Sequence, residues 1–298
     1  MRTIWLILLL NALFVGPIGQ SMAGELNGYL TLNFPGASRT WVNDTDGQGR
    51  FLVGNWSDGH IWRGFILQED NRFVSISYPG GKATYATSVN SSGIVVGNVT
   101  RGGSVHGFVL KGGQFTDFSV PGAYATYLEG INNDGWVTGF YDKEPNGVRS
   151  GFIHNGDTFL PVDVPGAISS EPHKIAADGT VVGTWRDTTG QHGFVYRGGV
   201  YTKLLVPLSS STEAFGIGND GIVVGTYDDK EGRHGFVFKE RIFYKVDIPG
   251  STYTKPLFLG AKGEIGGIFC NGEGINGFIY KKPPNLPQFS GLSVKRRY

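Results

Sequence analysis

The stretch "YTKLLVP" at residues 201–207 recurs three times with small changes, as "FTDFSVP" at 115–121, "FLPVDVP" at 159–165 and "FYKVDIP" at 243–249. Its closing proline belongs to a regular series: Pro35, Pro79, Pro121, Pro165, Pro207 and Pro249. Neighbouring prolines in this series are 42 or 44 residues apart. Such a constant spacing indicates that one structural unit is repeated six times along the chain.

Two other landmarks keep the same period. A glycine closes a "VVG"-like run at Gly54, Gly97, Gly139, Gly183, Gly225 and Gly267. A Gly-Phe pair places an aromatic residue at Phe65, Phe108, Phe152, Phe194, Phe236 and Phe278. Each unit divides into four short segments rich in β-branched and aromatic residues, separated by Gly, Asn and Asp turns. This pattern predicts an all-β fold, a six-bladed β-propeller with four short strands per blade, over residues 24–280.

The phase of the repeat predicts how the ring closes. The first unit is preceded by "GYLTLNFPG" at 28–36, which matches the fourth segment of a unit, whereas no such segment follows "GFIY" at 277–280. We therefore expect residues 28–34 to form the fourth strand of the last blade, beside strands that lie within 252–280. This pairing would join the two ends of the array.

The two ends of the sequence differ from the repeats. Residues 1–23 combine a positive charge, a short apolar run and small residues before Gly24, as in a secretory signal peptide, and the run is too short to span a membrane. We expect a secreted or periplasmic protein, with an irregular tail at 281–298. Without residues 1–23 the basic and acidic side chains balance, which argues against a nucleic-acid partner. A single cysteine, Cys270, excludes an internal disulfide framework.

The combined pattern also resembles a known family. The stretch "STEAFGIGNDGIVVGTYDDKEGRHGFVF" at 211–238 is similar to the bacterial extracellular repeats called HAF repeats, and the resemblance covers residues 28–280. Unit 1 departs from the pattern in "WVNDTDGQGRF", where the hairpin is one residue longer. The resemblance implies an exported β-propeller-like protein and assigns no activity.

Some repeated positions have a structural explanation. We expect the six phenylalanines after the repeated glycines to pack in the core. Five residues after each proline comes a hydroxyl: Thr40, Thr84, Thr126, Ser170, Thr212 and Thr254. We expect these hydroxyls to satisfy backbone groups in the turn.

The residue after each hydroxyl varies among the six units, which is what a binding rim would show. The six residues are Trp41, Tyr85, Tyr127, Glu171, Glu213 and Lys255. Aromatic faces stack against sugar rings or other flat ligands, and the charged groups would hold polar atoms. The alternative is that these are ordinary exposed side chains. The binding hypothesis predicts a module for a small-molecule or glycan ligand, with carbohydrate as the first candidate, or for a surface protein.

An enzyme is the main rival hypothesis. Glu171, Glu213 and His173 could act as catalytic groups of a carbohydrate-active hydrolase or lyase, if the carboxylates lie at a suitable separation. We predict no metal site, because the equivalent His106, His192 and His234 diverge from the propeller axis. We also predict no cofactor, although loop carboxylates would suit calcium. We expect a monomer without a membrane span.

Overall fold

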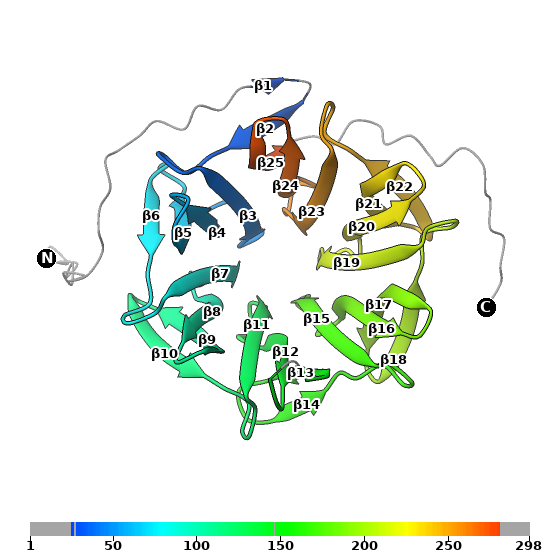
Figure 1. The fold of residues 1–298 in the computed structure, drawn as a ribbon, viewed down its shortest axis with the longest axis horizontal. Coiled ribbons are helices and arrows are strands. Elements are labelled where there is room, and N and C mark those ends of the chain that lie inside the picture. Colours follow the sequence, from blue (N-terminus) through cyan, green and yellow to red (C-terminus); the bar gives the residue numbers. More distant parts are fainter. Residues whose placement is uncertain (1–24, 27, 146, 281–298) are drawn as a thin grey trace, which may run out of the picture.

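The structure is a computed structural model that describes residues 25–26, 28–145 and 147–280. Its elements are all β-strands, arranged around a centre as in a propeller (Figure 1). The predicted signal peptide at 1–23 and the predicted tail at 281–298 lie outside the described residues. No helix among the described residues is long and apolar enough to cross a membrane.

The first four repeat units each form a separate antiparallel four-stranded sheet. Unit 1 contains β3 (Arg39–Thr45), β4 (Phe51–Ser57), β5 (Trp62–Gln68) and β6 (Phe73–Ile76). Unit 2 contains β7 (Ala83–Val89), β8 (Val95–Arg101), β9 (Ser104–Lys111) and β10 (Gln114–Phe118). Unit 3 contains β11 (Ala125–Ile131), β12 (Val137–Asp142), β13 (Arg149–His154) and β14 (Phe159–Pro161). Unit 4 contains β15 (Ser169–Ile175), β16 (Val181–Asp187), β17 (Gly190–Arg197) and β18 (Val200–Leu204).

The remaining strands form one nine-stranded sheet, so the prediction of six separate four-stranded sheets is wrong in this part of the chain. Unit 5 contributes β19 (Ser211–Ile217), β20 (Val223–Asp229), β21 (Gly232–Lys239) and β22 (Ile242–Val246). Unit 6 contributes β23 (Tyr253–Leu259), β24 (Ile265–Asn271) and β25 (Gly274–Tyr280). The two units are joined because Arg233 of β21 pairs with Tyr253 of β23 in a single parallel contact.

The N-terminal strands complete the sheet of unit 6. The strand β2 (Tyr29–Leu32) pairs antiparallel with β25 over four residue pairs, and β1 (Glu25–Leu26) pairs with β2. This is the pairing that the phase of the repeat predicted for residues 28–34. In addition, β3 of unit 1 packs against β23, β24 and β25 of unit 6.

The first strand of every unit lies nearest the centre and carries a β-bulge at the same place (Figure 1). In each case one residue has no partner on the second strand: Asn43, Thr87, Glu129, His173, Phe215 and Leu257. A bulge bends a strand and redirects the extra side chain, and bulges are common beside functional sites. We call these six residues the bulge layer.

The core is built from the repeated aromatic positions. The six phenylalanines of the Gly-Phe pairs are at most 2% exposed, which confirms their predicted packing role. The six predicted hydroxyls are also buried, and each accepts a hydrogen bond from the backbone N–H just before the repeated proline, at 2.8–3.0 Å. The prediction that they satisfy the turn is therefore confirmed.

Candidate functional site

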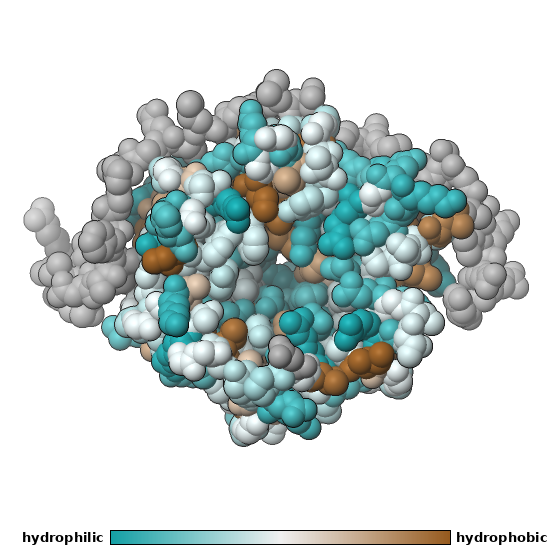
Figure 2. Space-filling view, viewed as in Figure 1, coloured by the Kyte–Doolittle hydropathy of each residue, from teal (hydrophilic) through white to brown (hydrophobic). Residues whose placement is uncertain are grey.

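The six residues predicted to form a binding rim occupy one register position on the innermost strands. Each lies two residues before the bulge layer, at the start of the strand, and each is partly exposed: Trp41, Tyr85, Tyr127, Glu171, Glu213 and Lys255. Side chains alternate along a strand, so these six lie on one face of their strands and the buried residues on either side of them lie on the other. We call these six the mouth ring. Figure 2 shows a hollow at the centre of the molecule, with hydrophilic residues along part of its border.

One side of the mouth ring is aromatic. The Trp41 ring centroid lies 4.5 Å from that of Trp62, which in turn lies 6.2 Å from that of Tyr85 in the next unit. In unit 3, Tyr127 stacks on Phe140 at 4.7 Å. The indole Nε1 of Trp41 has no hydrogen-bond partner among the described residues. Trp41, Trp62 and Tyr85 therefore form one aromatic surface across units 1 and 2, in which successive rings are tilted by 45° and 32°.

The carboxylates of the mouth ring are both paired with arginines. Arg149 Nη1 lies 2.8 Å from Glu171 Oε2, and Arg233 Nη2 lies 3.6 Å from Glu213 Oε1. Burial raises the pKa of Glu171, an effect that its contact with Arg149 partly offsets. Arg233 also binds Asp228 through two nitrogens, at 2.8 and 2.9 Å. Both carboxylates therefore have a fixed partner on their own protein.

The bulge layer places two titratable groups in the channel. Burial raises the pKa of Glu129 to about 7, although a hydrogen bond from Asn98 at 3.3 Å acts to lower this pKa. Burial lowers the pKa of His173 to about 3, helped by the positive charges of Lys255 and Arg149. At neutral pH His173 is therefore uncharged, while Glu129 exchanges its proton in the physiological range.

Lys255 differs from the other charged residues of the mouth ring. Its Nζ lies 3.8 Å from the centroid of the Phe215 ring, which belongs to the bulge layer of unit 5. Burial lowers the pKa of this ammonium, against the influence of Glu213. Within the described part of the chain, the ammonium makes no hydrogen bond and no ion pair.

A side cavity of about 720 Å³ opens from the mouth ring between units 2, 3 and 4. Tyr127 and Glu171 line it, together with Arg149, Asp142 and Arg186. Asp142 is 8% exposed and its Oδ1 has no hydrogen-bond partner among the described residues, and burial raises the pKa of this carboxyl. This volume lies within the range of ligand-binding cavities, so the mouth ring has room beside it for part of a ligand.

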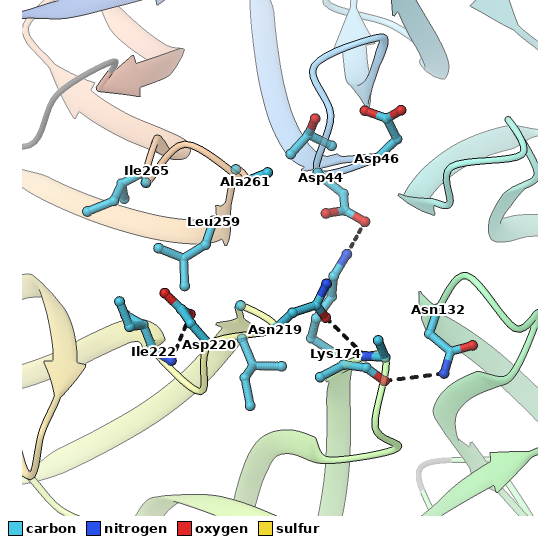
Figure 3. Close-up of a pocket in the computed structure, with 18 of the residues that line it drawn as sticks. Asp44, Asp46, Asn132, Lys174, Asn219, Asp220, Ile222, Leu259, Ala261 and Ile265 are labelled. Atoms are coloured by element: carbon cyan, nitrogen blue, oxygen red, sulfur yellow. Dashed lines mark hydrogen bonds and ion pairs between the residues drawn. The ribbon is translucent and has the colours of Figure 1, made fainter.

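A second cavity of about 720 Å³ lies at the opposite end of the channel, where the innermost strands end. Lys174 extends across it from unit 4 and forms an ion pair with Asp44 of unit 1 (Figure 3). The Lys174 ammonium also donates to Ser88 Oγ of unit 2 at 3.0 Å. Asn132 and Asn219 bond the backbone of unit 4 in the same region (Figure 3). These contacts join units across the ring and give this end a structural role.

The histidines that repeat before the Gly-Phe pairs have local partners in two units. His192 Nε2 lies 3.1 Å from Asp187 Oδ1, and His234 Nδ1 lies 2.8 Å from Asp247 Oδ2. Asp229, Glu231 and His234 together offer ligand atoms within 4.8 Å of one another. The Lys245 ammonium already lies 3.7 Å from Glu231 and 3.3 Å from Asp247, so a lysine supplies positive charge there and we assign no metal.

Four residues of the site were missed at the level of the sequence. Trp62, Arg149 and Arg233 come from the third strands of their units and reach the mouth ring only through folding. Glu129 had a detectable signal, because it occupies the same repeat position as His173, which was selected. That position holds a different residue in every unit, and the mouth ring varies in a similar way.

Comparison with known proteins supports the fold alone. No protein-family model and no curated protein sequence match this chain. In structure it is similar to a catalytically inactive virginiamycin B lyase from Staphylococcus aureus with Quinupristin, with a TM-score of 0.50 and 14% identity over 86% of this chain and 89% of that one. It is also similar to TolB from Acinetobacter baumannii, with a TM-score of 0.51 and 10% identity over 82% of this chain and 63% of that one. At these identities the likeness shows a β-propeller and carries no function.

Proposed function

We propose that this chain is an exported carbohydrate-binding module that holds a sugar at the mouth ring. The observation that supports this most strongly is the aromatic surface of Trp41, Trp62 and Tyr85, whose successive centroids lie 4.5 and 6.2 Å apart. All three side chains are partly exposed at a channel opening, where the face of an aromatic ring is available to a sugar ring. Polar residues on the other side of the mouth ring would contact hydroxyl groups of the sugar.

The proposal includes a scaffold of six blades closed by the N-terminal strand. Units 5 and 6 share a sheet through one residue pair only, so we count them as two blades. The pairing of β2 with β25 and the packing of β3 on unit 6 support a closed ring. A closed ring would hold the six mouth residues at fixed positions and so reduce the entropic cost of binding.

Catalysis by Glu171, Glu213 and His173 has less support than binding. Each carboxylate has an arginine partner, and a histidine with a pKa of about 3 is a poor acid and a weak base at neutral pH. We propose export on the sequence of residues 1–23 and the resemblance to HAF repeats. Detection of the protein in periplasmic or culture fractions would test that part.

The binding proposal is tested by a glycan array on the chain from residue 24 onward, with and without calcium, followed by titration calorimetry. For a sugar that binds, Trp62→Ala should weaken binding about tenfold or more, because it removes the middle of the aromatic surface, and burial of a large apolar side chain contributes about 1.5–3 kcal/mol. Trp136→Ala is the matched control, because this tryptophan lies at the opposite end of the channel beside Gly179.

The two variants together decide the proposal. A loss of affinity in Trp62→Ala with unchanged binding by Trp136→Ala supports the site. Thermal melting would verify that both variants fold. The absence of any bound sugar, or full affinity in folded Trp62→Ala and Tyr85→Ala variants, would show that the proposal is wrong.

A further inference from the structure

The ammonium of Lys255 is an unmatched positive charge within the mouth ring. Its three N–H groups face no acceptor among the described residues, and its one close contact is the Phe215 ring at 3.8 Å. An ammonium in a partly buried site favours an anionic acceptor, because charge-assisted hydrogen bonds are about twice as strong as neutral ones. The Lys255 ammonium therefore favours an anionic ligand.

The neighbouring carboxylates act on that charge from a distance, and none of the described ones forms an ion pair with it. Glu213, on the adjacent β19, forms an ion pair with Arg233, and Glu171 forms one with Arg149. His173 packs against Phe215, with ring centroids 5.0 Å apart, and is neutral near pH 7. Among the cations of the mouth ring and its ion pairs, Lys255 is thus the one without a carboxylate partner in the described residues.

A second unpaired donor lies on the next strand. Trp41 occupies the equivalent position on β3, which packs against β23, and its Nε1 has no acceptor among the described residues. This Nε1 is buried, whereas Lys255 is partly exposed, so the Lys255 ammonium is the donor open to an anionic group of a ligand. The adjacent aromatic surface would receive the ring to which such a group is attached.

We propose that the ligand of the mouth ring is an acidic glycan, and that the carboxylate of a uronic acid residue binds the Lys255 ammonium. This inference rests on the proposed carbohydrate-binding function and specifies its substrate class. Lys255 would then be the residue that selects a charged sugar over its neutral counterpart.

Glu129 makes this selection depend on pH. It lies near Lys255, Glu171 and Arg149, and its hydrogen bond comes from Asn98 on β8. The charged and titratable groups around Lys255 are Glu213 on β19, Arg233 on β21 and Glu129 across the channel. Tyr85 on β7 and His173 on β15 complete the surroundings of Glu129, and both are neutral near pH 7. Ionised Glu129 repels an anionic ligand, so binding should weaken as the pH rises through about 7.

The test compares trigalacturonate with its fully methyl-esterified form, which has the same rings without the charge. Calorimetry at pH 6 and pH 8 would give the two dissociation constants for the wild type, Lys255→Met, Lys255→Arg and Glu129→Gln. Met keeps the apolar stem on Phe215, and Arg keeps the charge. We expect the wild type to prefer the acid form about tenfold at pH 6, and severalfold less at pH 8.

Each variant has a distinct expected result. Lys255→Met should bind both forms equally, Lys255→Arg should keep the preference, and Glu129→Gln should keep it at both pH values. A wild type that binds both forms equally, or a Lys255→Met variant that still prefers the acid, would overturn the inference. If the methyl ester binds and Trp62→Ala abolishes that binding, the proposed function stands while acid recognition fails. If neither form nor any other sugar binds, both are wrong.

Discussion

At the scale of single residues, Leu208 breaks a rule that the other units obey. The residue after the repeated proline is glycine in five units, with φ between +73° and +80°: Gly36, Gly80, Gly122, Gly166 and Gly250. In unit 5 the same place is taken by Leu208, with φ of +65°. A leucine in this left-handed region is strained, and this one is 87% exposed. Because the side chain is exposed, Leu208 gains almost no burial that would offset the backbone strain.

We expect Leu208→Gly to raise the free energy of unfolding by about 1 kcal/mol. The change removes the energetic penalty of a leucine in the left-handed region, and almost no buried apolar surface is lost with the exposed side chain. Urea denaturation would measure the change. The mirror variant, Gly166→Leu, should lower stability by a similar amount, since an added Cβ there meets no atom within 4 Å and only the strain is introduced. An unchanged or reduced stability of Leu208→Gly would mean that the leucine makes a stabilising contact.

At the scale of the element, the connection between the fourth strand of one unit and the first strand of the next is fixed by one buried hydroxyl. Thr212 is fully buried and accepts a hydrogen bond from Val206 N–H at 3.0 Å. Ser209 Oγ lies 3.1 Å from the same oxygen. Because the hydroxyl recurs in all six units, each innermost strand starts from an equivalent anchor.

Two replacements of Thr212 distinguish the contribution of its hydroxyl to stability from that of its side-chain volume. Thr212→Val keeps the shape but leaves a buried N–H without an acceptor, which costs about 1–3 kcal/mol. Thr212→Ser keeps the acceptor and loses one methyl group, at a cost of about 1 kcal/mol. Chemical denaturation of both variants is the measurement. Equal or greater destabilisation in Thr212→Ser would show that packing, and not the hydrogen bond, is the important term.

At the scale of the whole molecule, the ion pair of Lys174 and Asp44 joins residues 130 positions apart across the ring. Asp44 also accepts from Val89 N–H at 3.2 Å, and Ser88 Oγ accepts from Ile131 N–H at 3.2 Å. One small network therefore connects units 1, 2, 3 and 4. The Asp44 side chain is 2% exposed, so its charge depends on Lys174 for compensation.

Lys174→Met should destabilise the protein by about 3 kcal/mol, because it leaves Asp44 buried without its cation. The double variant Lys174→Met with Asp44→Asn should lose less than the sum of the two single variants, as expected for directly coupled groups. Arg197→Met is the control: its ion pair with Asp178 is 74% and 49% exposed, and its loss should cost less than about 1 kcal/mol. Additive losses in the double variant would contradict direct coupling.

Much of the architecture could be predicted from the sequence, because it is repeated. The prolines, the buried phenylalanines, the six hydroxyls and the pairing of residues 28–34 with the last unit all follow from the period and its phase. The shared sheet of units 5 and 6 could not be predicted, since it depends on the close approach of Arg233 to Tyr253. A single contact of this kind leaves no periodic signal.

The site was predictable in position but less so in chemistry. The mouth ring was identified because one repeat position holds aromatic residues in three units and charged residues in the other three. The arginine partners of Glu171 and Glu213 were not, because Arg149 and Arg233 come from other strands and have no equivalent in most units. The shifted pKa values of Glu129 and His173 likewise arise from burial inside a channel, which only the assembled ring creates.

The pairing of β2 with β25 has a consequence for biosynthesis. The strand β2 pairs with a strand that the ribosome makes about 250 residues later. At elongation rates of about 5–20 residues per second, that interval is on the order of 10–50 s. During this interval, β2 has no native partner and its edge stays unpaired. The synthesis of the last hairpin, β24 and β25, is therefore the step that allows the N-terminal strand to pair.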